Sequence, residues 1–326
     1  MPSRAEQDKR DYLSSYSTIF VVNPSVFPVG FSIFRIMNKS LPIIIFCLSL
    51  CFLWTGCKEK KVTLGKDISF EKEENIRYGN DSEQILDLYL PHQEPSKKKD
   101  AFIIIHGGGW RGGDKSQLTF FTLSMMQKFP DHIFVNINYR LATATSPGIP
   151  NQTDDIQKVI QYLDKKLKYK PRLILLGNSA GAHLSMLYAY HFDVEKKVKA
   201  VVNMVGPSDL SDPGFEKYAD YSFVKNYLVN PKVVVSGRSK TSFASPISWV
   251  DSSSAPTLSY YGNRDQVIPL SQKRRLDSVF AQNKVSYESY EFNGGHLDWD
   301  KAPNDEFLID KIATFLKQLD EKITHR

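Results

Sequence analysis

The sequence predicts an α/β fold, with a mostly parallel central sheet covered by helices on both faces. Short apolar runs typical of strands alternate along the chain with longer segments that have helical periodicity. One apolar run, at 173–176, leads directly into the pentapeptide Gly-Asn-Ser-Ala-Gly at 177–181, and a helical segment follows it. A Gly-x-Ser-x-Gly string between a strand and a helix is a recurrent arrangement that holds a serine at a sharp turn. These observations together favour one α/β domain.

The strands can be placed in order along the chain. Segments 68–77 and 84–90 come first and look antiparallel, which makes the expected sheet mixed. The run at 101–105 is continuously apolar and ends in glycines, as expected of a buried central strand. Further strands are predicted at 133–137, 173–176, 198–205, 257–261 and 287–292.

Helices are predicted between these strands. The clearest is an amphipathic segment at 152–167, whose apolar face consists of Ile156, Val159, Ile160, Leu163 and Leu167. Other helices are expected at 118–128, 183–191, 270–282 and 305–321. The region 211–245 breaks the alternation and is rich in Ser, Tyr and Asp, so we expect a small insertion over the functional site.

Composition excludes several classes of function. The 326 residues, 41% hydrophobic and 24% charged, are typical of a globular protein with one large α/β domain. The net charge of +6 is modest, and the lysines form scattered short runs without a nucleic-acid-binding motif, so no nucleic-acid partner is expected. The 3 cysteines, Cys47, Cys51 and Cys57, all lie near the N-terminus. This placement excludes a disulfide framework, a cysteine nucleophile and a thiolate metal site from the rest of the chain.

The N-terminal part has the pattern of an export signal. Met37 looks like a second start, and the uncharged, mostly apolar run at 41–55 is shorter than the ~17–25 residues of a membrane-spanning helix. The run ends at Gly56-Cys57, after which charged residues follow. This resembles a bacterial lipoprotein signal, in which the cysteine is lipidated and becomes the mature N-terminus, although Trp54 stands where an aliphatic residue is usual. An uncleaved signal anchor and a plain secretory signal are the alternatives.

The chain is therefore expected to divide into four parts. Residues 1–36 are an upstream extension without a structural role, 37–57 are the lipoprotein-type signal, 58–66 are a tether, and 67–326 are the catalytic domain. The corresponding location is outside the cytoplasm, in the cell envelope, with the membrane as a partner through a lipid on Cys57.

Ser179 is the candidate nucleophile. A serine hydroxyl reacts poorly at neutral pH unless a base lies beside it and an acid orients that base. Of the 7 histidines, His296 follows the last predicted strand on a glycine-containing loop, and we expect it to be the base. His183, on the helix after Ser179, is expected to be a surface or packing histidine.

Asp265 is the candidate acid, because it follows the predicted strand at 257–261 directly. One helix and one strand fit between Asp265 and His296, which brings both loops to the same sheet edge. Asp209, Asp298 and Asp300 are rivals, and a simple turn aspartate is the structural alternative for Asp265.

The loop His106-Gly-Gly-Gly-Trp110 follows the central strand at 101–105. Acyl transfer passes through an oxyanion, and glycines let backbone N–H groups approach that charge. Together with the N–H of Ala180, this loop would form an oxyanion hole, while His106 braces the loop. A phosphate-binding turn is disfavoured because no Gly-Lys-Ser/Thr follows. No metal-binding motif is present, and no cofactor is expected.

These segments resemble the α/β-hydrolase superfamily, whose fold requires the order Ser179, Asp265, His296. The His-Gly-Gly-Gly-Trp loop resembles that of the hormone-sensitive-lipase-like esterases. Leu86-Asp-Leu-Tyr-Leu-Pro91 and Gly206-Pro-Ser-Asp-Leu210 resemble the bifunctional feruloyl and acetyl-xylan esterase-like group. The resemblance implies that Gly108, Gly109 and Ala180 donate to the oxyanion, with Gly107 as a possible replacement for one of the glycines. Asn178 is a departure, since relatives often have His or Glu there.

The resemblance implies a serine carboxylesterase that hydrolyses small acyl or feruloyl esters, on plant polysaccharides or their fragments, through an acyl-enzyme. The alternatives are a prolyl-oligopeptidase-type peptidase and an arylformamidase-type amidase. A non-catalytic surface binding protein on a hydrolase scaffold is disfavoured, because Ser179, Asp265 and His296 are all present.

Overall fold

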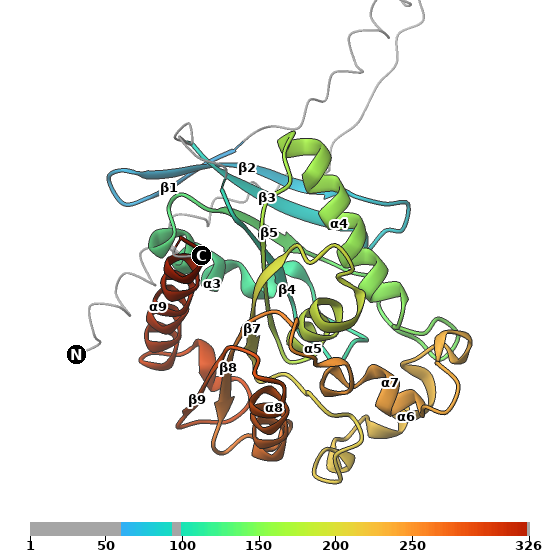
Figure 1. Ribbon diagram of the computed structural model, residues 1–326. Helices are drawn as coiled ribbons and strands as arrows, with labels where there is room; N and C mark the ends of the chain where they lie inside the picture. The colour runs from blue at the N-terminus through green and yellow to red at the C-terminus, as the bar shows by residue number, and fades with distance from the viewer. Residues whose placement is uncertain (1–59, 93–98, 325–326) are drawn as a thin grey trace, which may run out of the picture. The chain divides into compact units, whose positions relative to one another are not determined.

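A mixed sheet forms the centre of the protein. The computed structural model describes residues 60–92 and 99–324, and in this part the 9-stranded sheet has the order β1-β2-β3-β5-β4-β6-β7-β8-β9 (Figure 1). The extension 1–36, the predicted signal and Cys57 lie outside the described residues. The strands are β1 (Lys60–Leu64), β2 (Ile68–Arg77), β3 (Ile85–Pro91), β4 (Ala101–Ile105), β5 (Ile133–Ile137), β6 (Leu173–Asn178), β7 (Val198–Met204), β8 (Thr257–Gly262) and β9 (Tyr287–Phe292).

The pairing confirms the expected mixed sheet. Strands β1, β2, β3 and β5 pair antiparallel, each with the next in that order. From β5 through β4, β6, β7 and β8 to β9 every pair is parallel. All the carboxyl ends of these parallel strands therefore meet at one edge, which is where ligands bind in open α/β sheets.

Strand β1 corrects the prediction of a tether at 58–66. Lys60–Leu64 pairs in register with β2, from Lys60 opposite Lys72 to Leu64 opposite Ile68, so the folded domain begins at least as early as residue 60. Gly65, with φ 74°, lies in the turn between the two strands. Lysines and threonine dominate the segment, but its last residue, Leu64, is only 4% exposed and belongs to the core. An edge strand needs few apolar residues, which is why composition alone suggested a tether.

Helices cover both faces of the sheet (Figure 1). They are α3 (Thr119–Lys128), α4 (Asn151–Leu167), α5 (Ala180–Leu187), α6 (Tyr221–Tyr227), α7 (Lys240–Ala244), α8 (Leu270–Asn283) and α9 (Asn304–Thr324). Apolar residues of α4, α5 and α8 join one core cluster, and those of α3 and α9 join the other. Successive residues of β4 alternate between the clusters, as the period of a strand requires: Ile103 faces the first, and Phe102 and Ile104 face the second.

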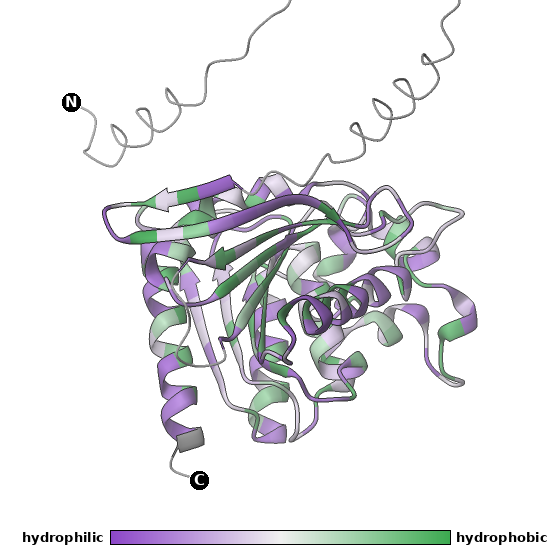
Figure 2. Ribbon diagram, turned by 90° about the horizontal axis from the view of Figure 1, so that it is seen from above, coloured by the Kyte–Doolittle hydropathy of each residue, from purple (hydrophilic) through white to green (hydrophobic). Residues whose placement is uncertain are grey.

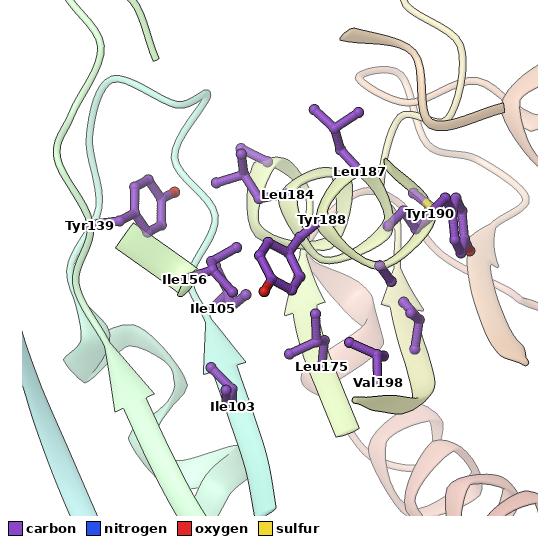
Figure 3. Packing of buried hydrophobic residues seen from close by; sticks show 14 of the residues in the cluster. Ile103, Ile105, Tyr139, Ile156, Leu175, Leu184, Leu187, Tyr188, Tyr190 and Val198 are labelled. Carbon is purple, nitrogen blue, oxygen red and sulfur yellow. The ribbon is translucent and has the colours of Figure 1, made fainter. Parts of the chain in front are cut away.

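The distribution of side chains follows these layers. Figure 2 shows hydrophobic residues along the central strands and hydrophilic residues at the surface of the helices. In Figure 3, Tyr188, which follows α5, points toward Leu175 of β6, while Leu184 and Leu187 lie on the side of the helix away from that strand. This packing anchors α5, the helix that follows the pentapeptide.

The predicted elements agree closely with the observed ones. Helix α5 is the main difference, because it begins at Ala180 instead of 183 and continues into a wider turn at Tyr188–Phe192. The insertion expected at 211–245 contains α6, α7 and short 3-10 turns.

Candidate active site

Ser179 lies at the turn between β6 and α5. Its φ of 51° and ψ of −120° are unusual for a residue with a side chain, and such strained serines are typical of nucleophiles held out of a sheet. Two hydrogen bonds hold this turn: the Ser179 N–H donates to the Met204 carbonyl over 2.8 Å, and the His183 N–H donates to the Ser179 carbonyl over 3.0 Å. The serine is therefore fixed by the neighbouring strand and by its own helix.

The two flanking glycines are required by close backbone packing. A Cβ on Gly181 would lie 2.0 Å from the Ile105 carbonyl oxygen, and a Cβ on Gly177 would lie 2.4 Å from the Gly181 carbonyl carbon. Both distances are far inside van der Waals contact, so no larger residue fits without moving the backbone. These contacts explain the glycines of the Gly-x-Ser-x-Gly string in this chain.

The structure brings Ser179, His296 and Asp265 together. The Ser179 Oγ lies 3.0 Å from His296 Nε2, and His296 Nδ1 lies 2.7 Å from Asp265 Oδ2. The Asp265 side chain is fully buried, and its Oδ1 accepts the N–H groups of Val267 over 2.7 Å and Ile268 over 2.9 Å. A carboxylate held in this way fixes the imidazole with Nε2 toward the serine, which is the geometry of nucleophilic catalysis.

The rival carboxylates have other partners. Asp209 pairs with Arg275 at 3.0 Å, far along the chain from the histidine loop. Asp298 accepts the Gly295 N–H over 2.7 Å and pairs with Lys301 at 2.7 Å. Neither is hydrogen-bonded to His296 in the described part of the chain, so Asp265 is the carboxylate that the geometry selects.

The glycine loop after β4 leaves two N–H groups available. The Gly107 N–H is taken, because it donates to Asn178 Oδ1 over 2.9 Å. Gly108 and Gly109 have φ of 120° and 60°, and their N–H groups, like that of Ala180, have no acceptor among residues 60–92 and 99–324. The geometry therefore favours Gly108, Gly109 and Ala180 as the oxyanion donors and removes Gly107 as a replacement.

His106 stabilises this loop through a hydrogen bond and ring stacking. Its Nδ1 lies 2.6 Å from the Gly107 carbonyl oxygen and donates to it, and its ring stacks on Tyr139 with centroids 4.3 Å apart. The Tyr139 hydroxyl donates to the His106 carbonyl over 2.9 Å. Burial lowers the pKa of His106, so the ring stays neutral, which agrees with a bracing role.

His183 joins the loop, the helix and the insertion. The Trp110 Nε1–H donates to His183 Nδ1 over 3.1 Å, and His183 Nε2 donates to the Ala244 carbonyl over 2.7 Å. Burial lowers the pKa of His183 to about 4, so this imidazole is neutral near pH 7. The sequence left a surface and a packing role open for His183, and no spacing pattern pointed to Trp110 or Ala244 as its partners.

Asn178 is a residue whose role the sequence left open. Its side chain connects the serine turn to the glycine loop by accepting the Gly107 N–H. Replacing it with alanine releases that N–H and lets the loop shift, so we expect Asn178→Ala to lower kcat for ester hydrolysis about tenfold, the cost of roughly one hydrogen bond in positioning.

The measurement is the kcat and KM of the purified variant on p-nitrophenyl acetate. Asn178→Asp, which keeps an acceptor oxygen, should retain more activity than the alanine variant. Equal kcat in wild type and Asn178→Ala would contradict a positioning role for this side chain.

No metal site accompanies these residues. In the part of the chain that the structure describes, no group of three or more His, Cys, Asp and Glu side chains is placed to hold a metal ion.

Comparison with known proteins supports the same fold. Residues 86–280 match the BD-FAE family. Esterase LipC of Mycobacterium tuberculosis is 26% identical over 263 residues, which cover 75% of this chain and 64% of LipC. Esterase LipQ of the same organism is 26% identical over 264 residues, covering 74% of this chain and 61% of LipQ. The match thus spans less than two thirds of these curated relatives.

Solved structures show the same architecture. A truncated carbohydrate esterase from gut microbiota has a TM-score of 0.60 at 19% identity and covers 81% of this chain and 98% of its own. A thermophilic esterase from Thermogutta terrifontis has a TM-score of 0.60 at 17% identity and covers 75% of this chain and 91% of its own. At these identities the likeness establishes the α/β-hydrolase fold.

Proposed function

The chain belongs to the BD-FAE family, and from this premise we propose that it is a serine carboxylesterase. The observation that carries the proposal is the hydrogen-bonded series Ser179, His296, Asp265, with contacts of 3.0 and 2.7 Å. The N–H groups of Gly108, Gly109 and Ala180 supply the donors that ester hydrolysis needs near the serine.

The proposed reaction has two steps. His296 takes the proton of Ser179 as its Oγ attacks the ester carbonyl, and the same proton passes to the leaving alcohol as the acyl-enzyme forms. Water then attacks the acyl-enzyme with His296 as base, and the serine is regenerated with release of the acid. Asp265 keeps the imidazole oriented and stabilises its charged form during both steps.

We propose short acyl or feruloyl esters on plant polysaccharides, or on their fragments, as the substrate class. Two proteins of similar structure support this substrate class: a carbohydrate esterase from gut microbiota and an acetyl ester-xyloside bifunctional hydrolase from Caldicellulosiruptor lactoaceticus. The second has a TM-score of 0.54 at 19% identity.

A formamidase activity is the second candidate. A kynurenine formamidase of Aspergillus versicolor is 32% identical over 123 residues, which cover 33% of this chain and 43% of that protein. The same triad could hydrolyse an N-formyl arylamine, because formamide hydrolysis also passes through an oxyanion.

A substrate panel tests these proposals. It contains p-nitrophenyl acetate, longer acyl esters, methyl ferulate, acetylated xylan, an N-formyl arylamine and a peptide amide, each measured with wild type and Ser179→Ala. Serine-dependent cleavage of the esters supports the esterase. Cleavage of the formyl amide or the peptide without ester cleavage would contradict it.

We propose further that the protein is exported and anchored in the cell envelope by a lipid on Cys57. The apolar run at 41–55 and the Gly56-Cys57 pair support this. Among residues 60–92 and 99–324, no helix has the length and apolar character to cross a membrane.

Radiolabelled palmitate measures this anchor in a bacterial host. We expect Cys57→Ser to lose the label and to shift from the membrane to the soluble fraction, because the acceptor sulfur is gone. Cys51→Ser is the matched control and should keep the label. Label that persists in Cys57→Ser would contradict lipidation at this residue.

A further inference from the structure

Tyr218, on the insertion, places its hydroxyl beside the glycine loop. A Cβ built on Gly109 would lie 2.7 Å from the Tyr218 Oη. Since a carbon–carbon bond adds about 1.5 Å, the hydroxyl lies within about 4 Å of the Gly109 Cα. Gly109 is one of the proposed oxyanion donors, so this hydroxyl is close to any ester bound at Ser179.

The hydroxyl is unused by the protein. It forms no hydrogen bond with any residue in 60–92 or 99–324, and it is not among the fully buried unpaired polar atoms of those ranges. By contrast, the Tyr221 hydroxyl contacts the Leu210 carbonyl oxygen, at 3.3 Å. Tyr218 therefore offers a free donor at the wall of the site.

The ring that carries this hydroxyl is held firmly. It stacks on Phe215 with centroids 5.3 Å apart and planes 10° apart, and Phe215 is fully buried. The Tyr218 N–H donates to the Phe215 carbonyl over 2.9 Å, and the Phe215 N–H donates to the Asp212 carbonyl over 2.9 Å. Burial and the nearby Asp220 raise the pKa of Tyr218, so the hydroxyl stays protonated as a donor.

The bound substrate determines whether the Tyr218 hydroxyl finds a hydrogen-bond acceptor. The carbonyl oxygen of the ester is already served by the N–H groups of Gly108, Gly109 and Ala180, so the Tyr218 hydroxyl suits a different oxygen. A plain alkyl or aryl ester offers the Tyr218 hydroxyl no acceptor, so its binding gains nothing from this donor. A sugar ester carries hydroxyl and ether oxygens next to the scissile bond and can accept the proton. A site with such a donor therefore binds the sugar ester more tightly than an analogue that lacks the acceptor.

We propose that Tyr218 is a substrate-binding residue that selects sugar esters by donating a hydrogen bond to a sugar oxygen adjacent to the scissile ester. This rests on the proposed esterase function and specifies the substrate class of the same site.

The test compares kcat/KM on an acetylated xylo-oligosaccharide and on p-nitrophenyl acetate for wild type, Tyr218→Phe and Tyr227→Phe. Tyr227 is a matched control, because it lies on the same insertion and is 45% exposed. We expect Tyr218→Phe to lower kcat/KM on the sugar ester about tenfold and to leave p-nitrophenyl acetate within about twofold. Tyr227→Phe should leave both unchanged.

Binding of the deacetylated oligosaccharide gives a readout that does not depend on turnover. Its inhibition constant against p-nitrophenyl acetate should rise in Tyr218→Phe and not in Tyr227→Phe. Equal losses on both substrates, no loss on either, or no cleavage of the sugar ester by wild type would overturn the inference. The Ser179→Ala variant separates a failure of this inference from a failure of the proposed esterase function: if its activity equals that of wild type, the proposed function itself fails.

Discussion

Ser179→Ala is expected to lower kcat for ester hydrolysis by about 10⁴- to 10⁶-fold while the protein remains folded. The loss is large because the reaction depends on a covalent bond to Ser179 Oγ, which lies 3.0 Å from the His296 Nε2 that removes its proton. Residual activity should be independent of His296, since the base then has no nucleophile to activate. Steady-state kinetics on p-nitrophenyl acetate, with contaminating esterase excluded by active-site titration, measures this effect.

Ser185→Ala is a suitable control for the serine prediction. Ser185 lies on α5, the helix that begins directly after Ser179; it is fully buried, and its hydroxyl donates to the Gly181 carbonyl over 2.8 Å. Its loss should change stability slightly and kcat little. A kcat of Ser179→Ala within about tenfold of wild type would contradict a covalent role for Ser179.

Asp265→Asn is expected to lower kcat by about 10⁴-fold, the second largest effect. The amide is nearly isosteric, but its nitrogen cannot accept the His296 Nδ1–H, so the ring would turn or carry its proton on Nε2. Either change removes the base from Ser179. The Asp265 carboxylate accepts hydrogen bonds from the backbone N–H groups of Val267 and Ile268. In the asparagine variant these N–H groups favour the amide oxygen, so the amide nitrogen would face His296.

The pH dependence of kcat/KM gives a second measurement for this variant. In this variant no carboxylate orients the imidazole or stabilises its charged form, so activity near neutral pH should be low. Activity should recover in part at high pH, where hydroxide replaces the base. Asp209→Asn is the control carboxylate, since Asp209 pairs with Arg275 and has no bond to His296. An Asp209→Asn variant that loses as much kcat as Asp265→Asn would contradict the assignment of the acid.

Local patterns in the sequence were sufficient for the fold class and for the candidate triad. Short apolar runs marked the strands, and Ser179, Asp265 and His296 each follow a strand end, so their meeting at one edge of a parallel sheet could be expected. The structure places them together, and the roles of the three residues remain predictions that the variants above test.

The contacts that position the triad could not be predicted in this way. The pairs Gly107–Asn178 and Trp110–His183 are 71 and 73 residues apart in the chain. They form only because β4 and β6 are neighbours, which places their loops side by side. No periodicity or motif encodes such a pairing. Strand β1 was missed for a different reason: an edge strand buries little apolar surface and therefore leaves a weak pattern.

Labelling with paraoxon, followed by peptide mapping, tests the central claim most directly, because an organophosphate reacts far faster with a serine that a working base has activated than with other side chains. The account predicts one diethylphosphoryl group, on Ser179, formed in step with loss of esterase activity, absent from Ser179→Ala and greatly slowed in Asp265→Asn. An adduct on another residue, or full ester hydrolysis by protein whose Ser179 is already modified, would contradict it.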